Sequence, residues 1–473
     1  MKTKIVATLG PASNSPVIME ALVKAGVDVF RINFSHANHE SLPGQIKTLR
    51  EIINRYHGRC AILGDLQGPK IRIGEVRGGS IRLEPGMQVR LAGGHGISDE
   101  SVLWISYNEL YNDVKPGETI LLDDGKLSLK VESRTHDGYL LARVVVGGIL
   151  TQRKGVNMPE SRLTVPALTE KDLADLKLAY HLEFDWIALS FVRKAKDIIE
   201  LKKEIRRLSR NWNPGVVAKI EKPEAVKNLD EIIEVTDALM VARGDLGVEM
   251  PFEQIPAIQK TIIRKAVPMC KPVIVATQML EGMLTNTRPT RAEINDVANS
   301  VMDGADALML SGETSMGQYP VEAVEAMSRI IAETEKFPET YHRPYAAPGN
   351  RTSRAVSDAI IGAAVDLSKQ LEARALLTYT LTGYTARKLS SLRPYAPIYI
   401  FAKSHRIIRR LNLHWGVTGF VQKNLHYTDD NLGQMVALLL KEELIEKGDL
   451  VIKIAGFPMK EKVKSNMVVV SRV

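Results

Sequence analysis

The sequence predicts an α/β protein: a parallel (β/α)8 TIM barrel, an all-β domain inserted into it, and a separate α/β domain after it. Three observations favour this fold class. Eight short apolar runs alternate with helical stretches, a long gap separates the third run from the fourth, and a new α/β pattern begins near residue 342. At 473 residues the chain is long enough for about three domains.

The barrel prediction depends on the character of the eight runs. They are continuously apolar, which is typical of parallel strands buried on both faces. The stretches between them have helical spacing, so the pattern predicts βα units in segments 1–69 and 166–341. A doubly wound open sheet is the alternative, but no G-x-G-x-x-G follows a strand. The runs are 4–10, 27–34, 60–66, 185–191, 215–221, 237–243, 272–279 and 306–313.

The inserted domain is predicted at 70–165. About 120 residues separate Asp65, at the end of the third run, from Asp185, where the fourth begins, whereas a βα unit needs only ~30. Short alternating segments and Pro-Gly and Asp-Gly turns fill the gap, which indicates a small β-barrel. It leaves the third strand at the face where barrel active sites lie, so we interpret it as a lid; a passive insertion is the alternative.

The last domain, 342–473, is basic. It holds 20 Arg plus Lys and 10 Asp plus Glu, a net +10, while the whole chain carries +8. This excess favours an anionic ligand, with a merely solvated surface as the alternative. Nucleic acid is a weaker candidate, because there is no aromatic-interleaved basic stripe, zinc spacing or RNA-binding signature.

Composition restricts the class of protein. Hydrophobic residues make up 45% and charged residues 25%, as in ordinary globular proteins. No run approaches the ~20 apolar residues of a membrane helix, and the first residues begin a strand rather than a signal peptide. Cys60 and Cys270 are predicted to be buried, reduced thiols. We therefore expect a cytoplasmic protein with no membrane partner.

Polar residues at the strand ends indicate the chemistry. Glu221 and Asp245 close successive strands one βα unit apart, where two carboxylates can share one Mg²⁺. Lys219 lies two residues before Glu221 and so faces the same side, inside the barrel. A buried lysine needs an anionic partner, which is either a substrate or, as the structural alternative, Glu221 itself.

Further groups belong to the same face. Gly244 allows close approach of the backbone, and free amides from Gly244 and Asp245 suit a carboxylate or phosphate. Thr277 ends the seventh strand with a hydroxyl that can orient water or a proton. Arg31 and Arg72 each follow a strand end and offer bidentate contact to phosphate. Cations, carboxylates and one divalent metal on one face are what phosphoryl transfer needs.

At these residues the chain closely resembles the pyruvate kinase family, of the bacterial type. The resemblance implies a barrel with a β lid and a C-terminal regulatory domain, and phosphoryl transfer from phosphoenolpyruvate to ADP, giving pyruvate and ATP in the last step of glycolysis. It also implies a homotetramer and a requirement for Mg²⁺ or Mn²⁺. The matching strings include TKIVATLGPAS, RINFSH, GDLQGPKIR, KGVNMP, AKIEKPEA, MVARGDLGVE, ATQMLEGM and NDVANSVMDGADALMLSGETSMGQYP.

The family's roles transfer onto matching residues. The resemblance implies that Lys219 neutralises the phosphoryl group in flight, that Arg31 contacts substrate phosphate, and that Thr277 lies near the carbon that is protonated. The amides of Gly244 and Asp245 would hold the substrate carboxylate. Metal ligands would be Glu221 with Asp245, and the nucleotide phosphates would meet Arg72 and Lys154.

One departure concerns the monovalent ion. Potassium-dependent members carry DTKGPEIR, whereas this chain has DLQGPKIR, with Leu66 for Thr and Lys70 for Glu. A fixed ammonium at Lys70 would replace the K⁺ that Asn33, Ser35 and Asp65 would otherwise ligate. Potassium is therefore expected not to be required.

A second departure concerns the effector loop. Members activated by fructose bisphosphate resemble TKSGRS; here the loop is TLTGYT, in which Leu381 and Tyr384 remove two cations. Its remaining hydroxyls and amides suit one phosphate, so we expect a monophosphorylated activator. Compensating charge would come from Arg387, Lys388 and the lysines at 460, 462 and 464. The predicted effector-binding residues are Thr380, Thr382, Gly383 and Thr385.

Two other functions stay open at this stage. Aldolase- or lyase-type barrels also bind Mg²⁺ through Glu and Asp next to a pyruvate enolate, but need neither the lid nor two phosphate-seeking arginines. A non-catalytic phosphometabolite sensor would not need Lys219, Glu221 and Asp245 together.

Overall fold

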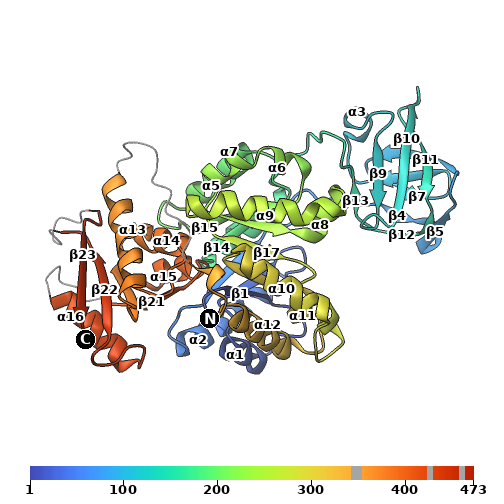
Figure 1. The fold of residues 1–473 in the computed structure, drawn as a ribbon. Coiled ribbons are helices and arrows are strands. Elements are labelled where there is room, and N and C mark those ends of the chain that lie inside the picture. Colours follow the sequence, from blue (N-terminus) through green and yellow to red (C-terminus); the bar gives the residue numbers. More distant parts are fainter. Residues whose placement is uncertain (342–353, 423–429, 458–463) are drawn as a thin grey trace.

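A computed structural model describes residues 1–341, 354–422, 430–457 and 464–473. Figure 1 shows three bodies in a row: the barrel in the middle, the lid joined to one side of it, and the C-terminal domain on the other side. The predicted fold class is confirmed, because eight parallel strands close into a barrel and a separate five-stranded sheet follows. The domain boundaries at 69/70, 165/166 and 341/342 stay predictions.

The barrel strands pair in the order β1-β18-β17-β16-β15-β14-β3-β2. All eight lie inside the predicted runs. Side chains from alternate positions fill the interior; most are small or branched, and the larger ones include Trp186, Met240 and Met309. The other faces pack on the surrounding helices. The strands are β1 (Lys4–Thr8), β2 (Val29–Asn33), β3 (Ala61–Asp65), β14 (Trp186–Leu189), β15 (Gly215–Ile220), β16 (Ala238–Ala242), β17 (Val273–Ala276) and β18 (Ala307–Leu310).

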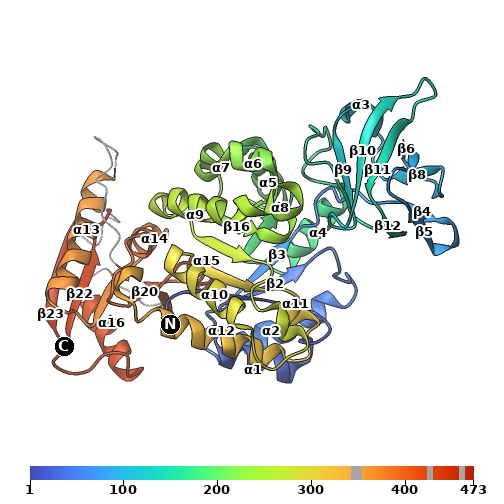
Figure 2. The same cartoon turned by 45° about the vertical axis from the view of Figure 1, so that its right-hand side comes forward.

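The barrel helices begin and end at residues whose chemistry favours those positions. The Ser15 hydroxyl caps the first helix by accepting from the Ile18 amide, and Gly26 ends it at φ 109°. Figure 2 shows the helices around the strands. They are α1 (Pro16–Ala25), α2 (Leu42–Arg55), α4 (Glu170–His181), α5 (Ala195–Leu208), α6 (Pro223–Lys227), α7 (Leu229–Val235), α8 (Arg243–Glu249), α9 (Ile255–Ala266), α10 (Arg291–Asp303), α11 (Gly312–Ser315) and α12 (Pro320–Thr334).

The inserted domain has its own apolar core. Its main sheet runs β13-β9-β10-β11-β6-β8, and β12 pairs with β5 and β4 with β7. The elements are β4 (Glu75–Val76), β5 (Ser80–Leu83), β6 (Gln88–Gly93), β7 (Ile97–Ser98), β8 (Val102–Ile105), α3 (Leu110–Asp113), β9 (Thr119–Leu122), β10 (Leu127–Arg134), β11 (Leu140–Val146), β12 (Gly148–Thr151) and β13 (Val156–Asn157).

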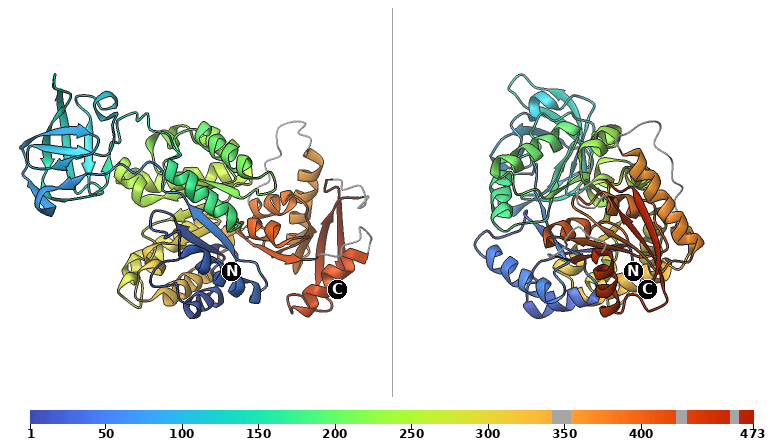
Figure 3. Two further views of the ribbon diagram at one scale, coloured as in Figure 1. Left: turned by 180° about the vertical axis from the view of Figure 1, so that it is seen from behind. Right: turned by 90° about the vertical axis from the view of Figure 1, so that its left-hand side faces the viewer.

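The C-terminal sheet runs β21-β20-β19-β22-β23, with only the last strand antiparallel. Figure 3 shows this domain against the barrel end opposite the lid. Buried Arg393 joins the two by an ion pair to Asp306, at 3.1 Å. The elements are α13 (Ala355–Gln370), β19 (Ala375–Tyr379), α14 (Tyr384–Ser391), β20 (Ile398–Ala402), α15 (His405–Leu411), β21 (Val417–Val421), α16 (Asp430–Lys441), β22 (Leu450–Ala455) and β23 (Met467–Arg472).

The cysteine prediction holds only in part. Both thiols are free. Cys60 is buried, and burial raises its pKa to about 12. Cys270 is only half-buried, because it follows a short 3₁₀ turn in left-handed conformation rather than lying in a strand. In the part of the chain that the structure describes, no helix is both long and apolar enough to span a membrane.

Candidate active site

A charged cluster lies at the carboxyl ends of neighbouring barrel strands. Arg31 Nε donates to Asp65 Oδ2 at 2.8 Å, and Arg31 Nη2 lies 2.6 Å from the same oxygen. Lys219 Nζ lies 2.7 Å from Glu221 Oε1 and 3.4 Å from Asp65 Oδ1, and donates to Ser190 Oγ at 2.8 Å. The structure therefore brings together two cations and two carboxylates, all buried.

Burial and the neighbouring charges shift the pKa values of Lys219, Asp65 and Glu221 in this cluster. Burial by itself favours the neutral amine of Lys219, but Asp65 and Glu221 raise its pKa well above the ordinary value. Burial also opposes ionisation of Asp65, yet Lys219 and Arg31 keep that pKa below its usual value. Burial raises the pKa of Glu221, and Lys219 only partly offsets this. The protonated Lys219 therefore lies beside Glu221, whose ionised form is unfavourable in this buried site unless a cation is near.

The Lys219–Glu221 ion pair expected as the structural alternative is present. Lys219 Nζ also contacts Asp65 and Ser190, so Glu221 is one of three protein partners of this ammonium. Glu221 Oε2 also accepts from the Phe191 amide at 2.8 Å. Phe191 has φ 53°, a conformation that residues other than glycine adopt at an energetic cost.

A second strained segment follows β17. Thr277 has φ 71°, which is unusual for a β-branched residue. Its hydroxyl accepts from the Gly244 amide at 2.7 Å, and Arg243 Nη2 donates to the Thr277 carbonyl at 2.8 Å. Arg243 is itself held by Asp296, whose Oδ2 is 2.7 Å away. These contacts hold Thr277 and the first turn of α8 together beside the cluster.

The expectation that both α8 amides are free needs a correction. The Gly244 amide donates to Thr277 in this structure, so only a rearranged hydroxyl would release it for a ligand. Asp245, in the same turn, is close enough to Lys219 and Glu221 to raise the pKa of each. It also lines a pocket between lid and barrel.

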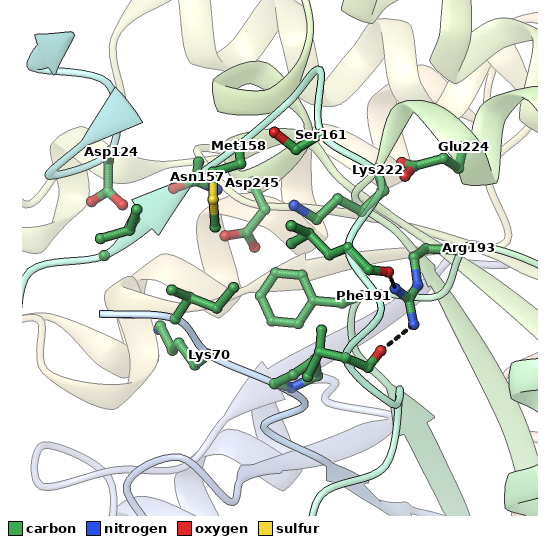
Figure 4. Close-up of a pocket in the computed structure, with 16 residues that line it drawn as sticks. Lys70, Asp124, Asn157, Met158, Ser161, Phe191, Arg193, Lys222, Glu224 and Asp245 are labelled. Carbon is green, nitrogen blue, oxygen red and sulfur yellow. Dashed lines mark hydrogen bonds between the residues drawn. The ribbon is translucent and has the colours of Figure 1, made fainter. Parts of the chain in front are cut away.

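Figure 4 shows this pocket. The Asp245 carboxylate and the Lys222 ammonium point into the same space near the Phe191 ring, and Lys222 Nζ lies 5.6 Å from the ring centroid. From the lid side, Lys70 and Asn157 contribute to the lining. The pocket therefore connects the strand-end charges to the lid segments on either side of the insertion.

The lid-borne cations lie at this junction. Arg72 pairs with Gly155 in a short β-bridge, and its Nη1 donates to the Arg153 carbonyl at 2.9 Å. Lys154 Nζ lies 2.8 Å from Asp123 Oδ1. The structure places Arg72 and Lys154 side by side on the lid, each with a protein partner, and not in contact with the barrel cluster.

The proposed monovalent-ion residues lie around the turn after β2. Asn33 Oδ1 accepts from the Ser35 amide at 3.1 Å, and both Asp65 oxygens already face Arg31 or Lys219. The pKa of His36 in that turn is lowered mainly by burial and, next, by the positive charge of Lys70. Lys70 is therefore close enough to contribute positive charge to this turn.

The donor set fits a divalent metal. Among the described residues no three His, Cys, Asp or Glu side chains form a metal-binding group. Glu221 and Asp245 supply two carboxylates, whose mutual repulsion a cation would relieve. Mg²⁺ is commonly held by one or two carboxylates, with waters and substrate oxygens completing its shell. Both residues would hold it.

The predicted effector loop is partly satisfied internally. Thr380 Oγ1 accepts from the Gly383 amide at 2.8 Å, and Thr385 Oγ1 lies 2.9 Å from Ser465 Oγ. Thr382 is exposed, and Gly383 has φ 82° at the start of α14. Lysines 460 and 462 lie outside the described residues.

Two residues of the site, Ser190 and Arg193, were missed in the sequence analysis. Ser190 bridges Lys219 and the Leu66 carbonyl, and its signal was a polar residue ending an apolar run. Arg193 donates to the Leu163 and Val165 carbonyls at 2.6 Å each, as Figure 4 shows. No sequence signal identifies this contact.

The fold and the site define a (β/α)8-barrel enzyme with a buried lysine–carboxylate centre suited to an anionic substrate. Comparison with known proteins identifies the family. The family model of the pyruvate kinase barrel domain matches residues 1–324, and that of the pyruvate kinase alpha/beta domain matches residues 358–471.

Individual pyruvate kinases are similar to this chain over nearly its whole length. The chain is 43% identical to a pyruvate kinase of Methylorubrum extorquens, over 99% of this chain and 96% of that protein. It is 41% identical to one of Mycobacterium tuberculosis, over 99% and 98%. A crystal structure of a pyruvate kinase from Cryptosporidium parvum superposes with a TM-score of 0.91 at 35% identity, covering 100% of this chain and 96% of that one. The chain therefore belongs to the pyruvate kinase family and is an enzyme, a phosphotransferase.

Proposed function

We propose that this enzyme transfers the phosphoryl group of phosphoenolpyruvate to ADP, with Mg²⁺ or Mn²⁺, giving pyruvate and ATP. The observation that carries the proposal is the buried cluster in which Lys219 lies between Asp65 and Glu221 with Arg31 beside it. Family membership supports the same reaction. Location in the cytoplasm, assembly as a homotetramer and activation by a phosphorylated metabolite belong to the proposal as predictions from the sequence.

The charge of each residue determines its role in the reaction. Lys219 is protonated across the physiological pH range, since its pKa is raised, and it stabilises negative charge on the phosphoryl group as the bond to the enolate oxygen lengthens. Arg31 binds a phosphate oxygen and is held in place by Asp65. Glu221 and Asp245 would hold the divalent cation, which would supply positive charge that stabilises the transferred group.

The remaining roles follow from position. Thr277, whose backbone is held by Arg243, orients the proton that the enolate carbon gains, once its hydroxyl leaves the Gly244 amide. The amides of Gly244 and Asp245 bind the substrate carboxylate after the Thr277 hydroxyl releases the Gly244 amide. Arg72 and Lys154 bind ADP phosphates from the lid, and in doing so exchange their present protein partners for phosphate. Lys70 supplies the charge that K⁺ provides elsewhere, near Asn33, Ser35 and Asp65.

A coupled assay tests the reaction directly. Formation of ATP and pyruvate in equal amounts from phosphoenolpyruvate, dependent on both ADP and Mg²⁺, is expected. Consumption of phosphoenolpyruvate or pyruvate that is independent of ADP, as an aldolase- or lyase-type barrel would show, would contradict the proposal.

A further inference from the structure

Lys222 is a buried cation in the pocket between lid and barrel, and it has no part in the roles proposed for Lys219 and Arg31. It directly follows Glu221, between β15 and α6, and its side chain is 11% exposed. Figure 4 shows its ammonium pointing into the same space as the Asp245 carboxylate. Burying an ammonium is costly unless it is paired. Lys222 therefore needs an anion, which is a protein group, a ligand or both.

One protein carboxylate holds the Lys222 ammonium. Lys222 Nζ donates to Glu249 Oε1, and the Glu249 side chain on α8 is 1% exposed. Within the described residues this is the only hydrogen bond of the Lys222 side chain, although an ammonium has three donors. The centroid of the Phe191 ring lies 5.6 Å from Nζ. The ion pair explains why the charge can be buried, but it leaves donors for a further acceptor in the pocket.

The same carboxylate binds the lid. Glu249 Oε1 also accepts from Asn157 Nδ2 of β13 at 2.7 Å, so one oxygen is shared by a lid side chain and by Lys222. The other oxygen, Oε2, is buried and has no hydrogen-bond partner in the part of the chain that the structure describes. Glu249 therefore fixes the Lys222 ammonium at the place where the lid meets the barrel.

Lys219 and Lys222 flank Glu221 in the sequence but have different surroundings. Lys219 contacts Asp65 in the strand-end cluster, whereas Lys222 contacts Glu249 at the lid junction. In phosphoryl transfer the attacking and leaving oxygens are roughly in line, so donor and acceptor approach the transferred group from opposite sides. Each phosphate that approaches brings negative charge, which a fixed cation stabilises. Lys219 serves the donor in the strand-end cluster, and Lys222 lies where an acceptor held by the lid would enter.

From this geometry we propose that Lys222 binds the terminal phosphate of ADP, and that Glu249 is a positioning residue that holds the ammonium in place. The inference rests on the proposed function, since it adds a residue for the acceptor of the same reaction. With ADP bound, the ammonium keeps its hydrogen bond to Glu249 and donates a second one to a phosphate oxygen. A charge-assisted hydrogen bond of this kind orients the oxygen that attacks the transferred group.

Titration calorimetry on the full-length enzyme tests the proposal, with ADP and phosphoenolpyruvate added separately and Mg²⁺ present in both titrations. Lys222→Gln should weaken ADP binding about tenfold or more, the scale of one lost hydrogen bond to a charged group, and should change phosphoenolpyruvate binding less than about twofold. Lys222→Arg, which keeps the charge, should bind ADP nearly as the parent does. The matched control is Lys227→Gln, an exposed lysine of α6, which should bind both ligands as the parent does.

The ion pair allows a binding role to be separated from a structural one. Lys222→Gln leaves Glu249 as an unpaired buried charge and should lower the thermal unfolding midpoint, whereas Lys222→Gln/Glu249→Gln removes both charges and should unfold close to the parent. The double variant should nevertheless bind ADP as weakly as Lys222→Gln does, because Glu249 acts on ADP only through Lys222. Recovery of ADP affinity together with the unfolding midpoint would show that the pair is merely structural, and would overturn the proposal.

The remaining outcomes distinguish this inference from the proposed function. Unchanged ADP affinity in Lys222→Gln, equal weakening of ADP and phosphoenolpyruvate, or a Lys222→Arg variant as weak as Lys222→Gln would each remove Lys222 from the ADP site while the proposed reaction stands. A parent enzyme that binds neither ADP nor phosphoenolpyruvate would overturn the proposed function, and this inference with it.

Discussion

Single side chains in the barrel mouth act through charge rather than covalent chemistry. Phosphoryl transfer leaves little bond-making to the protein, so positioned cations dominate. Lys219 and Arg31 are the two buried cations of the cluster, and each is held by Asp65. Their positions were predictable because both lie in apolar runs that form barrel strands, Arg31 in the middle of β2 and Lys219 near the carboxyl end of β15. The Ser190 bridge and the Gly244–Thr277 hydrogen bond were not, because they join residues far apart in the sequence.

Replacing Lys219 tests the main electrostatic contribution. Lys219→Met should lower kcat by ~10³ or more, the scale of losing a cationic phosphoryl clamp, with a modest change in the KM for phosphoenolpyruvate. Lys227→Met, an exposed lysine on α6, is the matched control and should retain full activity. Steady-state kinetics decide the matter: more than a tenth of the parent's activity in Lys219→Met would remove this residue from the mechanism.

The two carboxylates can be tested through the metal. Glu221→Gln and Asp245→Asn should each raise the Mg²⁺ concentration for half-maximal activity by about tenfold or more, because a neutral amide is a poorer ligand for a hard cation. Mg²⁺ titrations at saturating substrates measure the shift. Glu224→Gln, in the same pocket wall, is the control. A titration curve that coincides with the parent's would place the metal elsewhere.

The monovalent ion is tested at Lys70. Replacing K⁺ by tetramethylammonium at constant ionic strength should barely change the activity of the unmodified enzyme, because the Lys70 ammonium already provides the charge near the turn after β2. Lys70→Glu should become K⁺-dependent. Strong activation of the parent by K⁺ would show that Lys70 does not replace the ion.

At the scale of elements, the barrel strands followed from their continuous apolar runs, and the lid followed from the gap between two of them. The way the lid is attached could not be predicted. The Asn157 side chain donates to Glu249 on α8 at 2.7 Å, while Arg193, just after β14, binds two carbonyls of the returning segment. These contacts depend on the assembled fold, in which distant segments meet, and no local pattern encodes them. The strained φ values at Phe191 and Thr277 are likewise sustained by tertiary hydrogen bonds.

The Arg193 contact should matter for nucleotide binding. Arg193→Gln loses at least one of two hydrogen bonds to the Leu163 and Val165 carbonyls, each worth about 1 kcal/mol, and so loosens the lid that carries Arg72 and Lys154. We expect the KM for ADP to rise about fivefold, with little change for phosphoenolpyruvate, and faster proteolysis of segment 159–166. Arg193→Lys should show a smaller effect. Equal changes in both KM values would indicate a general defect rather than a lid effect.

At the scale of the whole molecule, the barrel separates the charged cluster from the C-terminal domain. Strands β14, β15 and β16 begin beside the cavity that Trp186, Asp237 and Arg410 line, and they end near the charged cluster, about 13–20 Å away at ~3.3 Å per residue. The net charge of +10 in the last domain predicted that an anion binds to this domain. It did not predict where in the folded domain the basic side chains lie. Arg387 and Arg410 face the barrel, a position that depends on how the two domains pack.

Activation by a phosphorylated metabolite is the last prediction. A monophosphate should shift the phosphoenolpyruvate half-saturation roughly 5–150-fold, the range of a 1–3 kcal/mol coupling, and fructose bisphosphate should be weaker, because Leu381 and Tyr384 leave no cations for a second phosphate in the loop. Thr382→Asp should bring the ratio of activated to unactivated rates close to one by like-charge repulsion, whereas Thr382→Asn, of the same size but neutral, should keep most of it. Thr385 is a poorer target, since its hydroxyl is bonded to Ser465 in a buried position. Substrate curves with and without each metabolite measure the effect. Activation that survives Thr382→Asp would place the effector away from this loop, and a substrate curve that no phosphorylated metabolite moves would show that the enzyme is not regulated in this way.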